Sequence, residues 1–152
     1  MEGRCQCGQC RFTTPSPRPL ELYICHCTEC RHQSSSAYGV TAIFRYFDFK
    51  QSTTERGAIA MYARPNSDGF TEGYFCTACG SRLAHVSVSP EGKVRHHVSI
   101  KGGCLEGLSK EMMRFAVHIW TRSAIVDIPE GAVQYEEEPP EDLSWPPEWM
   151  DE

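Results

Sequence analysis

The sequence lacks a long apolar run and an excess of positive charge. No apolar stretch approaches the roughly 20 residues that a membrane-spanning helix needs, and the opening MEGRCQCGQC has no apolar segment typical of a secretory signal. The formal net charge is −5, with acids concentrated in EEEPPED near the end. Because nucleic-acid-binding proteins usually present a basic face, nucleic acid is not expected as the main partner. We therefore expect a cytoplasmic protein with neither a membrane nor a nucleic acid as partner.

Cysteine is the residue type that the chain has in abundance. The 152 residues include nine cysteines, at positions 5, 7, 10, 25, 27, 30, 76, 79 and 104. An odd number does not suit a disulfide scaffold, and a reducing cytosol would not maintain one. Clustered cysteines in such a compartment are more often metal ligands or catalytic groups.

Alternating apolar and polar residues predict a mainly β fold. Segments rich in β-branched and aromatic residues lie at 20–24, 37–44, 59–62, 82–88, 94–100 and 115–120. Turn-forming Pro, Gly, Ser and Asn separate them, and short helical turns are expected only after Cys27 and at 108–113. At this length the chain should form one domain. We place that domain at residues 1–133.

The last segment, residues 134–152, has a different composition. It is acidic and rich in proline, and it carries Trp145 and Trp149. Such a charge run is usually a solvated, disordered tail. The two tryptophans favour the alternative that the tail packs on its own domain or on a second subunit of a homodimer, closing one side of a substrate pocket.

Four cysteines form two half-sites with the spacing of zinc knuckles. CQCG supplies Cys5 and Cys7, and FCTACG supplies Cys76 and Cys79, each pair being followed by a glycine that tolerates the backbone bend. Two such half-sites can close into a tetrahedral four-thiolate zinc site. The alternative is a set of buried free thiols.

The remaining cluster, CHCTEC, offers one ligand fewer. Cys25, Cys27 and Cys30 provide three thiolates, and a catalytic zinc site keeps its fourth position for water or substrate. The alternative is a second closed site, and the candidates for its fourth ligand are Cys10, His26, His32 and Cys104. Three thiolates make zinc a weak Lewis acid for water but suit a thiol as fourth ligand. Reversible thiol addition or carbon–sulfur cleavage is therefore the chemistry that we favour.

Five motifs resemble one known family. CQCG at 5–8, CHCTECR at 25–31, FCTACG at 75–80, KGGCL at 101–105 and HIWTRS at 118–123 are similar, in order and spacing, to those of glutathione-dependent formaldehyde-activating enzymes and centromere protein V. The resemblance covers roughly residues 3–125. Cys10, Cys104 and the segment AIVDIP after HIWTRS depart from the family pattern.

The resemblance implies a fold, two zinc ions and an activity. The family fold is a single zinc-containing domain of several small coiled antiparallel β-sheets. Its cysteines matching 5, 7, 76 and 79 hold a structural zinc, and those matching 25, 27 and 30 hold a catalytic zinc with an exchangeable position. The founding activity is that of a carbon–sulfur lyase joining glutathione to formaldehyde; a glutathione conjugate is a further substrate class.

Cations near the second zinc would balance the charge that a substrate thiolate adds. Arg31, Lys101 and Arg122 lie within the family-like motifs and are our predicted substrate-binding residues. The alternative for each is an ordinary solvated charge. The alternative function is a non-catalytic zinc scaffold for protein interactions, of the centromere protein V kind.

Overall fold

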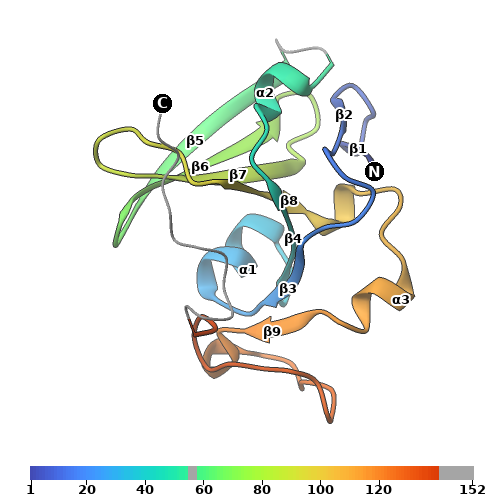
Figure 1. Cartoon of the computed structure of the whole chain (residues 1–152), viewed down its shortest axis with the longest axis vertical. Coiled ribbons are helices and arrows are strands. Elements are labelled where there is room, and N and C mark those ends of the chain that lie inside the picture. The colour runs from blue at the N-terminus through green and yellow to red at the C-terminus, as the bar shows by residue number, and fades with distance from the viewer. Residues whose placement is uncertain (55–57, 141–152) are drawn as a thin grey trace.

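Strands make up most of the regular structure in the computed structural model, which describes residues 1–54 and 58–140 (Figure 1). The predicted packing of Trp145 and Trp149 lies outside these residues. The strands of the described residues are β1 (Glu2–Arg4), β2 (Arg11–Thr13), β3 (Glu21–Cys25), β4 (Gly39–Arg45), β5 (Ile59–Asn66), β6 (Gly69–Cys76), β7 (Arg82–Val88), β8 (His97–Lys101) and β9 (Val117–Ile119).

The helices among the described residues are short, and the first begins inside the second cysteine cluster. Cys27 caps α1 (Thr28–Ser34), because its Sγ accepts a hydrogen bond from the Cys30 backbone N–H at 3.3 Å. Ser35 ends α1 in the left-handed conformation. The other helical segments are α2 (Phe49–Ser52), α3 (Lys110–Met113) and the 3₁₀ turns η2 (Gly102–Cys104) and η3 (Thr121–Ser123).

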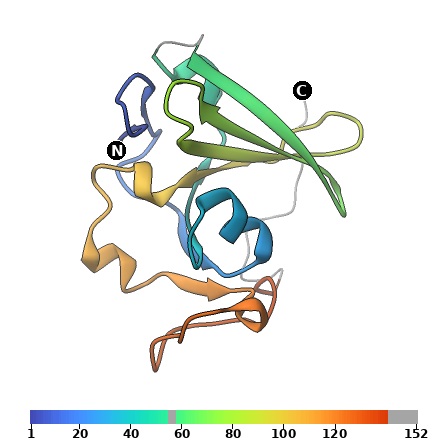
Figure 2. The same ribbon diagram turned by 180° about the vertical axis from the view of Figure 1, so that it is seen from behind.

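Seven strands join one sheet in the order β5-β6-β7-β8-β4-β3-β9. Neighbours run antiparallel except β3 and β9, which are parallel. The β1–β2 hairpin forms a separate sheet of two strands. Figures 1 and 2 show α1 between the β5–β7 part of the large sheet and β9, with β3 and β4 beside it. The fold thus places the helix that follows Cys27 against β4 of the large sheet.

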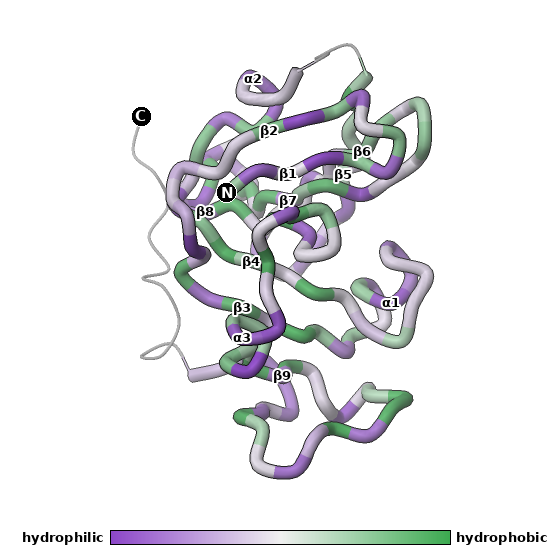
Figure 3. The backbone as a smooth tube through the Cα atoms, turned by 90° about the vertical axis from the view of Figure 1, so that its right-hand side faces the viewer, coloured by the Kyte–Doolittle hydropathy of each residue, from purple (hydrophilic) through white to green (hydrophobic). Residues whose placement is uncertain are grey.

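The two faces of the large sheet have opposite character. Side chains alternate between faces along a strand, so one face of β4, β7 and β8 carries the core (Ala42, Phe44, Ala84, Val86, Val98 and Ile100). The other face is more polar: it carries Ser99, which pairs with Ile43 on one side and with His85 on the other. The hydropathy-coloured chain in Figure 3 shows the apolar segments running through these central strands.

The mainly β fold class is confirmed, and so is the absence of long helices from the described residues. The predicted segment 82–88 coincides with β7, and the other predicted strands overlap β3, β4, β5, β8 and β9. Prediction missed β1, β2, β6 and α2. The β6 sequence GFTEGYFC contains two glycines and a charge, which weaken the strand signal, but β5 and β7 pair with it on both sides. No helix of the described chain is long and apolar enough to span a membrane.

Candidate metal centres and active site

The four cysteines of the first centre come together from two distant segments. Cys5 and Cys7 lie in the β1–β2 connection, and Cys76 and Cys79 lie at the end of β6 and just after it. Their four sulfurs lie within 4.8 Å of one another; the Cys5 and Cys7 sulfurs are 3.5 Å apart, and those of Cys7 and Cys76 are 3.9 Å apart. The predicted pairing of the two half-sites is therefore present, and four thiolates at these separations fit one tetrahedral zinc ion.

Glycine makes both knuckles of this centre. Gly8 has a φ of +77° and Gly80 a φ of +74°, a left-handed conformation that residues with a Cβ rarely adopt. Each glycine donates its backbone N–H to the carbonyl of the first cysteine of its pair, Gly8 to Cys5 at 3.1 Å and Gly80 to Cys76 at 2.8 Å. The turns therefore direct both thiols of each pair toward one point.

Cys10 and Cys104 lie at the first centre and not at the second. The Cys10 backbone N–H donates to Cys5 Sγ at 3.3 Å, and its own thiol points to the Ala58 carbonyl. Burial raises the pKa of Cys104, as does its proximity to Cys5. Its thiol contacts the Arg82 carbonyl at 3.4 Å. Neither cysteine completes the three-cysteine cluster.

The second centre consists of Cys25, Cys27 and Cys30, here called the triad. Cys25 ends β3, Cys27 caps α1, and Cys30 faces inward from the first turn of that helix. Their sulfurs lie within 4.8 Å of one another, and no further Cys, His, Asp or Glu side chain of the described residues joins them. None of the four residues considered for the alternative closed site, Cys10, His26, His32 and Cys104, joins the triad, so the arrangement matches a site with an open position.

A glycine and two hydrogen bonds hold the triad in place. Gly39 pairs with Cys25 across β3 and β4, and a Cβ on Gly39 would lie 3.2 Å from the Cβ of Cys30. The Gln33 side-chain amide donates to Cys30 Sγ at 3.4 Å, as the Cys30 backbone N–H does to Cys27 Sγ. N–H donors aimed at sulfur stabilise thiolates, which are the form that ligates metals.

Sulfur crowding perturbs the ionisation of the triad. Hydrogen bonds from Cys25 and Cys30 lower the pKa of Cys27 to about 2. The hydrogen bond between the Cys25 and Cys27 thiols raises the pKa of Cys25 far above its ordinary value. One thiol therefore ionises at the expense of its neighbours, and three adjacent thiolates require a cation. This donor chemistry fits zinc.

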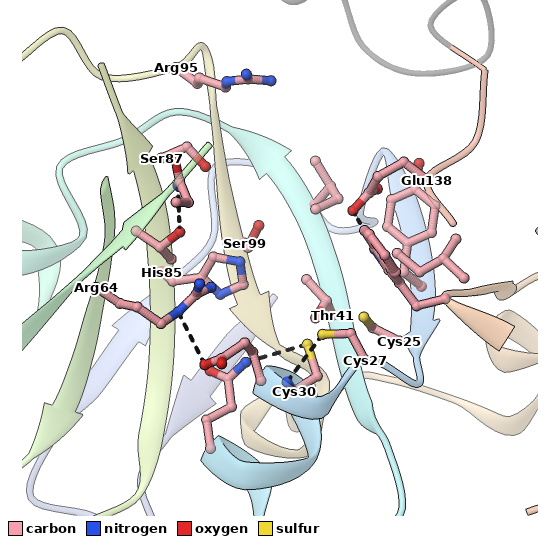
Figure 4. A pocket seen from close by; sticks show the side chains of 18 of the residues that line it. Cys25, Cys27, Cys30, Thr41, Arg64, His85, Ser87, Arg95, Ser99 and Glu138 are labelled. Carbon is pink, nitrogen blue, oxygen red and sulfur yellow. Dashed lines mark hydrogen bonds and ion pairs between the residues drawn. The ribbon is translucent and has the colours of Figure 1, made fainter. Parts of the chain in front are cut away.

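The triad opens onto a pocket of about 830 Å³. One wall is formed by the triad and α1, and the facing wall by the polar face of the sheet, from which Arg64, His85 and Arg95 project (Figure 4). Glu138 lies on a third side near Cys25 (Figure 4), together with Trp120, which packs against the cluster that contains Cys25. The triad thus lies in a cavity large enough for a small peptide, whereas the four-cysteine centre does not line this pocket.

Comparison with known proteins identifies the family to which the chain belongs. A profile of the family described as "Glutathione-dependent formaldehyde-activating enzyme" matches residues 1–123, most of the chain and all seven cysteines of the two centres. The chain belongs to this family. A protein of Halomonas elongata named "Putative glutathione-dependent formaldehyde-activating enzyme" is 31% identical over 86 residues, which cover 55% of this chain and 54% of that protein. The chain therefore spans about half the length of this curated relative.

Lys101 lies under the triad, on the pocket-facing side of β8. It pairs with Thr41 of β4, its residue is only 8% exposed, and its Nζ has no hydrogen-bond partner among the described residues. Burial lowers the pKa of Lys101, whereas Cys30 and the other two triad sulfurs act to raise it. In this member of the glutathione-dependent family, an ammonium group thus faces the thiolate cluster.

None of the three predicted substrate-binding residues, Arg31, Lys101 and Arg122, is among the residues that line the pocket. Arg31 follows Cys30 in α1 and is half-buried. Arg122 is exposed, pairs with Glu137 and lies over the Trp120 ring at 5.1 Å. Their role in binding substrate stays a prediction.

His26 and His118 form a buried pair behind the triad. His26 Nε2 and His118 Nδ1 are 2.9 Å apart, and the two rings stack. Burial lowers the pKa of both imidazoles. His26 is therefore oriented toward His118 of β9, and it does not join the triad as a fourth ligand.

The described part of the acidic segment, residues 134–140, runs beside β9. Gln134 bridges His118, and the Tyr135 backbone N–H donates to the His118 carbonyl at 2.9 Å. Trp120 donates its indole N–H to Glu138 at 2.7 Å, and Glu138 and Pro139 line the pocket. The domain boundary that we predicted at residue 133 stays a prediction, but the residues directly after it contact the domain.

Sequence reasoning missed the pocket residues outside the motifs. Arg64, Arg82 and His85 lie on β5 and β7, two strands that contain no cysteine. No spacing in the sequence relates these residues to the triad. Trp120 lies within a predicted motif, but its left-handed φ of +57° and its pocket position are not visible in sequence. Only the alternation of polar residues along β7 and β8 could have indicated a functional face.

Proposed function

We propose that the protein is a zinc-dependent carbon–sulfur lyase that joins the thiol of glutathione to formaldehyde, or to a similar small electrophile, and reverses this reaction. The observation that carries the proposal is the contrast between the two centres. Four cysteines close one of them, whereas three converge at the wall of a cavity of about 830 Å³. The family membership supports glutathione and formaldehyde as the reactants.

The residues fit one structural and one catalytic zinc per chain. At the triad, the metal would supply a soft position at which a thiol binds as its thiolate. Cys25, Cys27 and Cys30 would hold it, while Cys5, Cys7, Cys76 and Cys79 would hold the structural ion. The structural centre joins the β1–β2 hairpin to the end of β6, and its binding energy would contribute directly to folding.

The reaction requires no additional reagent. The sulfur of the substrate thiolate attacks the carbonyl carbon, a carbon–sulfur bond forms, and the electron pair of the C=O bond moves to oxygen. The proton that the thiol gives up ends on that oxygen, so the product contains every atom of both reactants. Three thiolates on one divalent cation carry a charge of −1, and a fourth thiolate makes it −2. Lys101 offers the nearby positive charge that offsets this increase.

The test is catalysis of equilibration between glutathione, formaldehyde and S-hydroxymethylglutathione, followed by NMR exchange spectroscopy. The full chain should increase the exchange rate in proportion to enzyme concentration. Cys27→Ser should remain folded and lose the increase, because it removes a triad ligand. A Cys27→Ser protein as active as the native chain would refute the triad as the catalytic centre.

A further inference from the structure

Arg82 differs from Arg64 and Arg95, the other two arginines that line the pocket, in making no ion pair with a described residue. Arg64 pairs with Glu29 at 3.3 Å and Arg95 with Asp68 at 3.6 Å, while Glu138 accepts the Trp120 hydrogen bond. The Nε of Arg82 is inaccessible to water and has no hydrogen-bond partner among the residues that the structure describes, and the guanidinium forms no ion pair with them. A half-buried arginine in this state is costly unless an anion joins it.

The surroundings of Arg82 add to this cost. Burial lowers its pKa, and the adjacent Arg64 lowers it further. Lys101 and Arg82 also act together on His85, whose pKa is held well below its ordinary value mainly by burial. Guanidinium groups remain protonated under such conditions, so positive charge accumulates on this wall of the pocket.

A glycine provides the space that Arg82 occupies. A Cβ on Gly73 of β6 would lie 1.6 Å from a terminal nitrogen of the Arg82 guanidinium. The side chain therefore lies directly across the β6 backbone, a position that any other residue at 73 would block. The guanidinium is thus held at the pocket wall, near enough to the triad for Cys30 to stabilise its charge.

We propose that Arg82, with Arg64 beside it, binds a carboxylate of the thiol substrate while the substrate sulfur is at the triad. This proposal rests on the proposed function and specifies which part of the substrate the sheet wall recognises. A planar guanidinium matches a carboxylate through two parallel hydrogen bonds, whereas formaldehyde has no group of this kind. Glutathione has two carboxylates separate from its thiol, as such a two-point attachment requires.

The test compares ligands that differ only in the carboxylates. S-methylglutathione keeps both carboxylates but cannot form a thiolate, and its diethyl ester has neither carboxylate. Calorimetric titration of the full chain should show that Arg82→Gln weakens binding of S-methylglutathione about tenfold or more, the effect of losing a charge-assisted hydrogen bond. The ester should bind the native chain and Arg82→Gln equally weakly.

Three further variants separate recognition from folding. Gly73→Ala should reproduce the loss, because its methyl group displaces the guanidinium and leaves the arginine in the chain. Arg82→Lys should retain part of the affinity, since an ammonium group keeps the charge but cannot form the two parallel hydrogen bonds of a guanidinium. Arg18→Gln, an exposed position away from the pocket, should bind like the native chain.

The outcomes distinguish this proposal from the proposed function. Equal losses for the acid and the ester, unchanged binding in Arg82→Gln, or no binding of S-methylglutathione to the native chain would each overturn the carboxylate site. Arg82-dependent binding without any exchange of glutathione with formaldehyde would leave the carboxylate site standing and overturn the lyase reaction.

Discussion

Replacing Lys101 by methionine should separate the charge balance of the triad from the stability of the fold. The ammonium is nearly inaccessible to water and has no hydrogen-bond partner among the described residues. Methionine has a similar length and removes only the charge and its desolvation cost. Because an unpaired buried charge opposes folding, the metal-free Lys101→Met protein should unfold at the same temperature as the native chain or at a higher one.

The same substitution should weaken thiol binding. Coulomb's law with an effective dielectric constant of about 20 gives about 4 kcal/mol for unit charges at 4 Å and about 2 kcal/mol at 8 Å. All three triad sulfurs act to raise the pKa of Lys101, so we assign its separation from the cluster to this range of distances. At 8% exposure, little water screens the interaction. A substrate thiolate adds one negative charge to the cluster. Its affinity should therefore fall at least about tenfold in Lys101→Met.

Two measurements check this prediction. Thermal unfolding of the metal-free protein reports stability, and titration of the zinc-loaded protein with glutathione reports thiol affinity. Lys110→Met is the matched control, because Lys110 is exposed on α3 and away from the pocket. A destabilised Lys101→Met protein with native thiol affinity would show that Lys101 serves the fold and not the cluster.

Other predictions follow from the two centres and the pocket wall. Elemental analysis should find about two zinc ions per chain. Cys76→Ser should abolish soluble expression, whereas Cys27→Ser should give a folded protein with one zinc. Identical behaviour of the two variants would contradict separate roles for the two centres. Gly39→Ala should place a methyl group 3.2 Å from the Cys30 Cβ, costing about 1–3 kcal/mol in denaturant unfolding and weakening metal binding at the triad. Glu138→Gln should leave the unfolding temperature nearly unchanged, because the hydrogen bond between Glu138 and Trp120 is exposed. It should strengthen glutathione binding up to about fivefold, because it removes a negative charge from the pocket; weaker binding would contradict this prediction.

The two cysteine clusters could be predicted from sequence because each is built from short segments with a characteristic spacing. Cys76, Cys79 and Gly80 fall within five consecutive residues, and a knuckle turn requires nothing more distant than a hydrogen bond between the first and last of them. Pairing this knuckle with Cys5 and Cys7 needed only the rule that a structural zinc takes four ligands. Chemistry carried by such short segments is visible without knowledge of the fold.

The pocket could not be predicted because it depends on strand order. Arg82 approaches the triad only because β7 pairs with β8 and β8 pairs with β4, which places His85, Ser99 and Ile43 in one row across the sheet. No periodicity within β7 reports that pairing. The space for the Arg82 guanidinium depends in turn on Gly73, in a strand that sequence analysis missed.

The position of α1 explains why the polar face of the sheet can act as a binding wall. A polar sheet face is ordinarily solvated, and its charges are then screened. Here α1, Glu138 and Pro139 line the same pocket as Arg82 and His85, so these cationic residues lie on the wall of a cavity and not on an open sheet face. Charges in such a space interact more strongly than at an open surface. The segment that supplies Cys27 and Cys30 therefore also creates the environment in which the opposing cations can hold an anionic thiol.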